Sequence, residues 1–245
     1  LQRRGYLDDA RRLRDDLLRL GWYRYFHVGH DVHVAARHAS RTGDFTTAAH
    51  LYDRAIVGSL RLAASFREAQ AYMVIPQRAT QARMQAALKS GRIDEALALA
   101  RTAIRAMPGD FETAISIVTA LDRAGRELEA AELFSGVWRR YESVCQEFPD
   151  CVLAHNSLAW FAAHCGRELD GALDHARTAV RLDPTNSGVL DTLAEVHFRR
   201  GEQQLSLATM RKCLELSPGR PYFVQQLARF TKGDRAAAVP NSDDK

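Results

Sequence analysis

A glycine that is followed five or six residues later by a small residue recurs five times along the chain. The five segments are Gly43 to Ala48, Gly91 to Ala96, Gly125 to Ala130, Gly166 to Ala172 and Gly201 to Ser206. Each lies between two stretches with an apolar helical pattern. Glycine accepts the left-handed backbone of a tight turn, and a small residue lets two helix backbones approach each other. The sequence therefore predicts an array of helix pairs.

The spacing of the glycines indicates one repeating unit with additions. Successive glycines are 48, 34, 41 and 35 residues apart, which is a unit of 34 residues with additions of 14, 0, 7 and 1. Because ~3.6 residues make a helical turn, an addition of seven or fourteen lengthens a helix and keeps its apolar stripe on nearly the same side. We expect long second helices after Gly43 and after Gly125.

The two C-terminal copies resemble the tetratricopeptide repeat (TPR) family, in which each unit is a helix, a tight turn and a second helix. The first copy contains Leu158, Ala159, Gly166, Ala172, Ala176, Ala179 and Pro184, and the second contains Leu193, Ala194, Gly201, Ser206, Met210, Cys213 and Pro218. The resemblance implies an all-α fold, a right-handed α-solenoid of antiparallel helix pairs that bury a continuous core. In such a fold the matched residues serve packing and carry no chemistry.

We expect residues 1–230 to form a single TPR-like solenoid. Its parts would be a partial unit over 1–28, units over about 29–76, 77–110, 111–150, 151–186 and 187–219, and a capping helix over 220–230. Residues 57–76 depart most from the period, either as a continued helix or as a local insertion, and Pro76 ends this segment in both cases. Residues 231–245 are predicted to be a disordered tail. Because residues 5–10 look like half of a unit, we expect the chain to be a fragment of a longer protein.

Composition and charge are those of a soluble globular protein. The chain is 46% hydrophobic and 26% charged, close to the usual shares of about 45–50% and about 25%. No apolar stretch approaches the ~20 residues of a membrane span. The opening residues lack the apolar run of a signal peptide, which favours a cytoplasmic location. Nucleotide-binding, zinc-protease and serine-hydrolase motifs are absent from the sequence, so we expect neither an enzyme nor a cofactor.

Two groups of histidine and cysteine residues are candidates for a metal site. The first group is His27, His30, His33 and His38, and the second is Cys145, Cys151, His155, His164 and Cys165. A rise of ~1.5 Å per residue separates the ends of the first group by about 16 Å along a helix. The second group lacks any recognisable ligand spacing. We therefore expect no metal ligands, and a disulfide between Cys145 and Cys151 stays open as an alternative.

The family resemblance implies that the first helices of successive units line a concave groove, which holds an extended or helical segment of a partner. Its residues lie thirteen, ten, six and two or three positions before each turn glycine. The predicted partner-binding residues are His30, His33, Arg37, Arg41, Arg78, Gln81, Gln85, Lys89, Asn156, Trp160, Asp191 and Glu195. The groove would be basic at first, then apolar and aromatic, and finally acidic. We expect a bound segment to be acidic where it meets Arg37 and Arg78, because a basic concave wall focuses potential.

Together these features predict a non-catalytic scaffold that binds another protein or a peptide segment. Two alternatives stay open. One is the repeat arm of a longer enzyme or signalling protein whose catalytic domain lies upstream of residue 1. The other, RNA binding, is disfavoured because base readout by helical repeats needs regularly recurring contact residues, which the irregular spacings do not supply.

Overall fold

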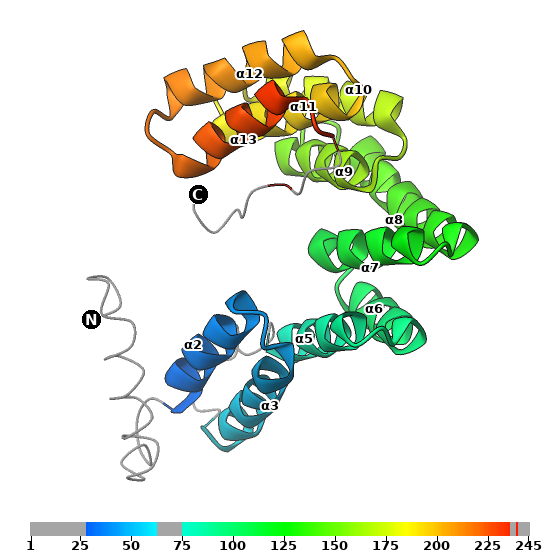
Figure 1. The fold of residues 1–245 in the computed structure, drawn as a ribbon, viewed down its shortest axis with the longest axis vertical. Coiled ribbons are helices and arrows are strands. Elements are labelled where there is room, and N and C mark those ends of the chain that lie inside the picture. The colour runs from blue at the N-terminus through cyan, green and yellow to red at the C-terminus, as the bar shows by residue number, and fades with distance from the viewer. Residues whose placement is uncertain (1–27, 63–74, 236–238, 240–245) are drawn as a thin grey trace. The chain divides into compact units, whose positions relative to one another are not determined.

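The computed structural model describes residues 28–62, 75–235 and 239, and the described part is built of α-helices (Figure 1). The chain divides into two compact units, Leu1–Thr113 and Ala114–Lys245. The first contains α2 (Val28–Arg41), α3 (Phe45–Leu62), α5 (Ile75–Lys89) and α6 (Ile93–Ala106). Helix α7 (Phe111–Arg123) crosses into the second, which contains α8 (Glu127–Glu147), α9 (Val152–Cys165), α10 (Leu169–Leu182), α11 (Ser187–Arg199), α12 (Gln203–Leu216) and α13 (Pro221–Lys232). The expected all-α helical-repeat fold is confirmed.

The turns between paired helices use the predicted glycines. Gly43, Gly91, Gly125, Gly166 and Gly201 all have positive φ angles, between 64° and 84°. In each turn the residue after the glycine donates its N–H to the carbonyl five residues earlier, as Arg126 does to Leu121 at 2.9 Å. Such a bond satisfies a carbonyl that the helix end leaves without a partner. The left-handed glycine therefore both ends the first helix and aims the chain into the second.

The small residue that follows each glycine is completely buried in the core. Ala48, Ala96, Ala130, Ala172 and Ser206 are all 0% exposed. A larger side chain at these positions would push neighbouring helices apart, since interiors are packed as densely as organic crystals. The recurring small residue is thus a packing requirement, as the sequence predicts.

The additions to the repeat lengthen second helices. Helices α6, α10 and α12 each have 14 residues, whereas α8 has 21 and α3 has 18. The expectation of long helices after Gly43 and Gly125 is confirmed. Pro76 lies in the first turn of α5, where its missing N–H has no helical partner to lose.

Several expectations fall on parts of the chain outside the described residues. The partial N-terminal unit lies almost wholly before residue 28, and residues 63–74 of the expected insertion lie in the gap between α3 and α5. Most of the expected tail is also outside, although α13 continues to Lys232.

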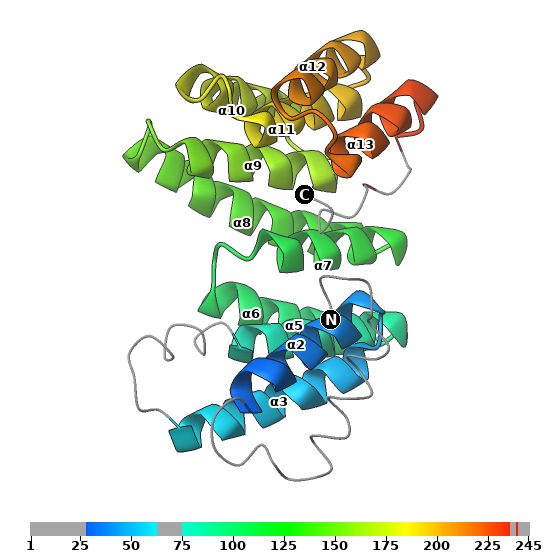
Figure 2. The same cartoon turned by 90° about the vertical axis from the view of Figure 1, so that its left-hand side faces the viewer.

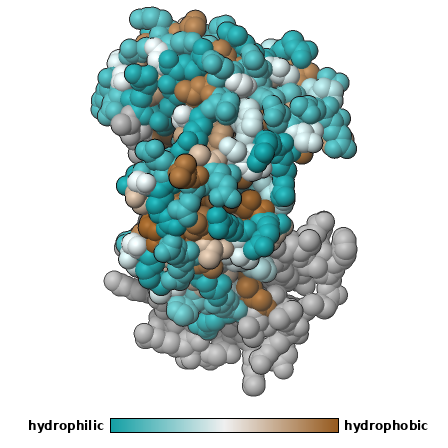
Figure 3. All heavy atoms as spheres, turned by 90° about the vertical axis from the view of Figure 1, so that its right-hand side faces the viewer, coloured by the Kyte–Doolittle hydropathy of each residue, from teal (hydrophilic) through white to brown (hydrophobic). Residues whose placement is uncertain are grey.

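None of the described helices is long and apolar enough to cross a membrane. Hydrophilic residues cover much of the face drawn in Figure 3, with apolar patches scattered between them. Large exposed apolar residues include Leu128 and Leu153, which are 88% and 73% exposed. Single exposed leucines are common on protein surfaces, so such a residue gains meaning only from its surroundings.

Candidate functional site

A pocket of about 440 Å³ lies in the second unit between α9 and α11, which pack against each other (Figure 2). Helix α9 lines it with Val152, Leu153, Asn156, Ser157 and Trp160. The segment before α11 and the start of α11 line it with Asp183, Asn186, Gly188, Val189 and Thr192. The pocket thus lies between two of the helices that the repeat pattern assigns to the groove.

Helix α9 has one side in the core and another on the pocket. Ala154, Leu158 and Ala162 are buried in the core. Leu153, Asn156 and Trp160 follow one another at steps of three and four residues, which places them on one helical face. The small core side brings α9 close to its neighbours, and the opposite face supplies an aliphatic, an amide and an aromatic side chain to the pocket.

The rim on the α11 side is fixed by the cap of that helix. Asn186 Oδ1 accepts hydrogen bonds from the N–H of Gly188 at 3.0 Å and of Val189 at 3.4 Å. Its Nδ2 donates to Asp183 Oδ2 at 2.9 Å. These bonds satisfy N–H groups that the first turn of a helix leaves without partners. The polar rim is therefore held in place from within the chain.

Asn156, one of the residues that line the pocket, has a buried amide oxygen, Oδ1, without a hydrogen-bond partner among the described residues. A buried polar atom without a partner costs about 1–3 kcal/mol. A ligand that brings a donor to this atom would recover that free energy, and a backbone N–H is such a donor.

Trp160 is held by His164, one turn further along α9. The two rings lie with their centroids 4.4 Å apart, and His164 Nδ1 donates to the Trp160 carbonyl oxygen at 2.9 Å. Burial lowers the pKa of His164, which favours the neutral imidazole around pH 7. The imidazole of His164 therefore packs beside the indole of Trp160 on the pocket side of α9.

Two predicted partner-binding residues are occupied within the chain instead. Asp191 and Glu195 are 3% and 2% exposed, because α13 packs over α11. Gln226 Nε2 donates to Asp191 Oδ1 at 3.4 Å, and Arg229 forms an ion pair with Glu195. The expectation that these two carboxylates face a partner is replaced by a role in holding α13.

The predicted residues of α2 lie in the first unit. Arg37 and Arg41 are exposed. His33 packs its ring edge-on against Tyr52, with 5.8 Å between the centroids. The side chain of His30 lies outside the described residues. The exposed cations are thus those at the C-terminal half of α2.

The predicted residues of α5 are at four positions along one face. Arg78, Gln81 and Gln85 are partly buried, and Lys89 is exposed. Lys89 Nζ donates to the carbonyl oxygen of Gly43 at 3.0 Å, which ties the end of α5 to the turn between α2 and α3. The basic and acidic halves of the predicted groove therefore differ in exposure. The described basic residues are exposed or partly exposed, whereas the acidic residues of α11 are buried.

The pocket contains residues that the repeat pattern missed. Asp183 and Asn186 line it from the turn before α11, whereas counting back thirteen residues from Gly201 begins inside the helix. An asparagine just before a predicted helix start is a cap signal. That signal could have placed Asn186 at the rim of the groove.

The cysteines form no disulfide. All four, Cys145, Cys151, Cys165 and Cys213, are free, so the alternative of a Cys145 to Cys151 bond is not supported. Cys145 instead lies close to two histidines, His155 and His175, with one ligand atom of each residue within 4.8 Å of the others. This group is the one place among the described residues where three side chains of metal-binding type come together.

Comparison with known proteins supports the repeat assignment. Residues 81–143 match the family model for the tetratricopeptide repeat, which confirms the resemblance seen in the glycine, alanine and proline pattern. No curated protein sequence matches the chain.

The chain is similar to several solved structures. A thermophilic TPR protein from Thermus thermophilus is 17% identical with a TM-score of 0.51, over 84% of this chain and 98% of that one. YrrB, described as a TPR protein with an unusual peptide-binding site, is 15% identical with a TM-score of 0.37, over 83% of this chain and 92% of YrrB. A tetratricopeptide repeat protein from Parabacteroides merdae ATCC 43184 is 11% identical with a TM-score of 0.43, over 84% and 73% of the two chains. At 17% identity the likeness to the Thermus protein concerns the fold alone.

Proposed function

We propose that this chain, which carries tetratricopeptide repeats over residues 81–143, is a non-catalytic binding module that holds an extended segment of another protein between α9 and α11. Proteins built from these repeats generally act as protein-interaction scaffolds. The observation that carries the proposal is Asn156, a residue of the pocket lining whose Oδ1 is buried and has no hydrogen-bond partner among the described residues.

The chemistry of the pocket suits a peptide. An extended backbone offers an N–H that donates to Asn156 Oδ1, and an adjacent aliphatic side chain packs against Leu153 and Trp160. Leu153 is 73% exposed, and covering a side chain of this size stabilises a complex by about 1.5–3 kcal/mol. A fixed polar group beside an apolar wall is the usual arrangement by which a pocket orients its ligand.

The same lining argues for binding rather than catalysis. The polar groups are amides, hydroxyls and the carboxylate of Asp183. That carboxylate accepts a hydrogen bond from Asn186 Nδ2 at 2.9 Å. A general acid or base would need a titratable group aimed at the reacting atom, and the carboxylate here serves the helix cap.

The first unit supports a preference for acidic residues in the partner. Arg37 is exposed on α2, and Arg78 is partly exposed on α5. Arginine pairs with carboxylates through a planar fork of donors. An acidic stretch of the bound protein is the chemistry that such side chains recognise.

Selection from a random peptide library displayed on phage, with the whole chain as bait, tests the proposal. The affinity of a selected peptide would then be measured by fluorescence anisotropy for the unchanged chain and for Asn156→Ala and Leu153→Asp. We expect both variants to bind at least ~10-fold more weakly, a difference of about 1.4 kcal/mol. Helix content by circular dichroism checks that the variants are folded.

A matched control separates the pocket from the rest of the surface. Leu205, 52% exposed on α12, lies outside the pocket lining, so Leu205→Asp should leave the affinity unchanged. The proposal is wrong if no peptide is enriched, or if the selected peptides lose no affinity with Asn156→Ala and Leu153→Asp.

A further inference from the structure

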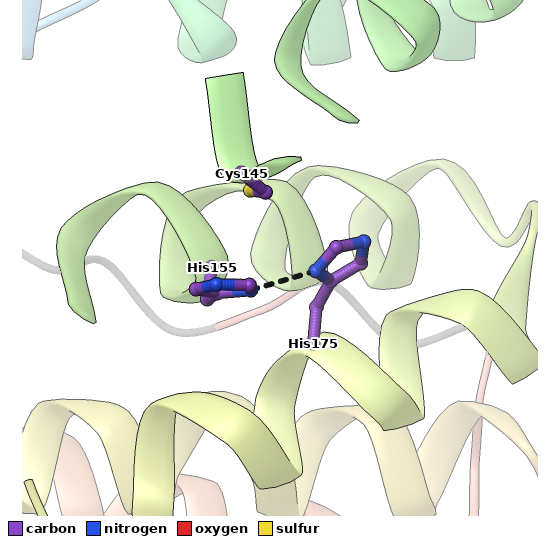
Figure 4. A group of neighbouring side chains, drawn as sticks. All are labelled: Cys145, His155 and His175. Carbon is purple, nitrogen blue, oxygen red and sulfur yellow. Dashed lines mark hydrogen bonds between the residues drawn. The ribbon is translucent and has the colours of Figure 1, made fainter. Parts of the chain in front are cut away.

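Three side chains from three consecutive helices meet beside the α8–α9 turn (Figure 4). Cys145 comes from the end of α8, His155 from the first turn of α9 and His175 from the middle of α10. One ligand atom of each lies within 4.8 Å of the other two. His155 Nδ1 is 2.8 Å from His175 Nδ1, so the two imidazole rings already turn the same kind of atom toward each other.

The hydrogen bond on the far side of His155 fixes which nitrogen is free. His155 Nε2 lies 3.0 Å from the carbonyl oxygen of Pro149. A carbonyl oxygen can only accept, so Nε2 carries the hydrogen and Nδ1 of the neutral ring presents its lone pair to the other two residues. A ligating histidine usually donates its second ring N–H to a carbonyl or carboxylate in this way.

The position of this group in the repeat is not explained by repeat packing. Helix α8 is 21 residues long where α10 and α12 have 14, and Cys145 lies in the two turns that this addition supplies. Pro149 belongs to the segment that follows. The departure from the 34-residue period therefore supplies both the thiol and the carbonyl that orients His155.

Two of the three side chains are buried. Cys145 and His155 are 3% and 7% exposed, respectively. Burial raises the pKa of Cys145 to about 11, with smaller effects of Cys151 and Glu142 in the same direction. Burial, followed by His155, lowers the pKa of His175, while Asp174 opposes this. Near neutral pH the thiol thus keeps its proton and the His175 imidazole is uncharged.

We propose that Cys145, His155 and His175 bind one transition-metal ion of the zinc class, through a thiolate and two imidazole nitrogens. This donor set suits Zn²⁺ and its analogue Co²⁺ and does not suit Mg²⁺ or Ca²⁺, which prefer oxygen ligands. Three protein ligands leave a fourth tetrahedral position for water or an external ligand.

The two nitrogens need only a small adjustment to accept the ion, whereas Cys145 Sγ, which lies within 4.8 Å of them, must approach to about 3.6 Å for a Zn–S distance of about 2.3 Å. Zn–N distances of about 2.0–2.1 Å in a tetrahedron set the two nitrogens about 3.3 Å apart, so the pair at 2.8 Å must separate by about half an ångström. The hydrogen that His175 Nδ1 donates to His155 moves to His175 Nε2. The Cys145 thiol releases its proton to solvent, so one proton leaves for each ion bound.

The ion would clamp the added turns of α8 to α9 and α10. Earlier in α8, Trp138 already packs its ring edge-on against His175, with 5.7 Å between the ring centroids. This site is independent of the pocket between α9 and α11, so it does not rest on the proposed function.

The test uses the whole chain without a histidine tag, reduced and stripped of metal with a chelator. Titration with Co²⁺ should show a thiolate-to-metal charge-transfer band in the near ultraviolet, and Zn²⁺ should then remove the band by displacing Co²⁺. Equilibrium dialysis with elemental analysis should give one zinc ion per chain. Less than half an ion per chain, or a cobalt complex without the thiolate band, would overturn the proposal.

Variants assign the ligands. Cys145→Ser should abolish the charge-transfer band. His175→Gln should weaken Zn²⁺ binding at least ~10-fold, because losing even a residue that only hydrogen-bonds to a metal ligand costs about that much affinity. His175 is only partly buried, so this variant is the one expected to keep the fold, which circular dichroism checks. The control His50→Gln changes an exposed histidine of α3 and should bind as the unchanged chain does. Equal Zn²⁺ affinity in all three variants would overturn the proposal.

Discussion

Glu195 of α11 and Arg229 of α13 form an ion pair from which water is nearly excluded, with side chains 2% and 5% exposed. Arg199 Nε donates to Glu195 Oε1 at 2.7 Å, and the Arg229 guanidinium lies over the Phe198 ring, 4.8 Å from its centroid. Burial lowers the pKa of Arg229, and the Glu195 carboxylate opposes that effect. This pair attaches α13 to α11.

Removal of the carboxylate should destabilise the second unit strongly. Glu195→Ala leaves the buried Arg229 without its counter-charge, which costs about 3–5 kcal/mol in the free energy of unfolding. Urea unfolding followed by circular dichroism measures the loss. The control is Asp170→Ala, which breaks a pair whose acidic side chain is 95% exposed and should cost less than about 1 kcal/mol. Similar losses in the two variants would show that burial of the pair does not matter.

Two glycines close together in the chain should respond to alanine with opposite signs. Gly125 has φ +72° and open space around an added Cβ, so Gly125→Ala suffers only backbone strain, about 1–2 kcal/mol. Gly136 lies inside α8 and also has open space around it, and alanine there stabilises a helix by about 0.5–1 kcal/mol. Thermal unfolding of both variants checks the signs. A gain in stability with Gly125→Ala would contradict the left-handed turn.

The turns and core contacts could be predicted because their rule is local. Gly125 has to be left-handed and Ala130 has to be small in any array of this kind, whatever surrounds the unit. The helix lengths follow from the same local rule. The seven residues added between Gly125 and Gly166 lengthen the second helix by about two turns, which keeps its apolar stripe on nearly the same side. Counting back from Gly166 gave Asn156 and Trp160, which both line the pocket; that they bind a partner stays a prediction.

The burial of the α11 carboxylates could not be predicted by the same rule. Counting back from Gly201 treats every unit alike, but α13 covers α11, and nothing in the local sequence links Arg229 to Glu195. The Cys145 group was missed for a related reason. Its third member, His175, belongs to a different helix from its partners, and only the packing of α10 on α9 brings it to His155.

Charge reversal on the first unit tests the expected preference for acidic partners. For a selected peptide that contains acidic residues, Arg37→Glu with Arg78→Glu should weaken binding and reduce its dependence on salt, because attraction between exposed charges is screened within about 10 Å at 0.1 M salt. Fluorescence anisotropy at low and high salt measures both effects. Arg54→Glu reverses an exposed charge on α3 and should change neither. An affinity that salt does not alter would remove the electrostatic part of the proposed function.

Zinc binding should strengthen as pH rises. The pKa of Cys145 is raised to about 11, so between pH 6 and pH 9 the metal-free thiol is protonated, and each ion that binds must displace its proton. The apparent association constant should therefore increase about tenfold per pH unit over this range. Because the pKa of His175 is lowered, its protonated form competes with zinc binding only in more acidic solution. Calorimetry in buffers of different ionisation enthalpy counts the protons released, with one per ion expected at pH 7 to 8. Binding without proton release would mean that Cys145 is not a ligand, and in Cys145→Ser any residual binding should have lost this pH dependence.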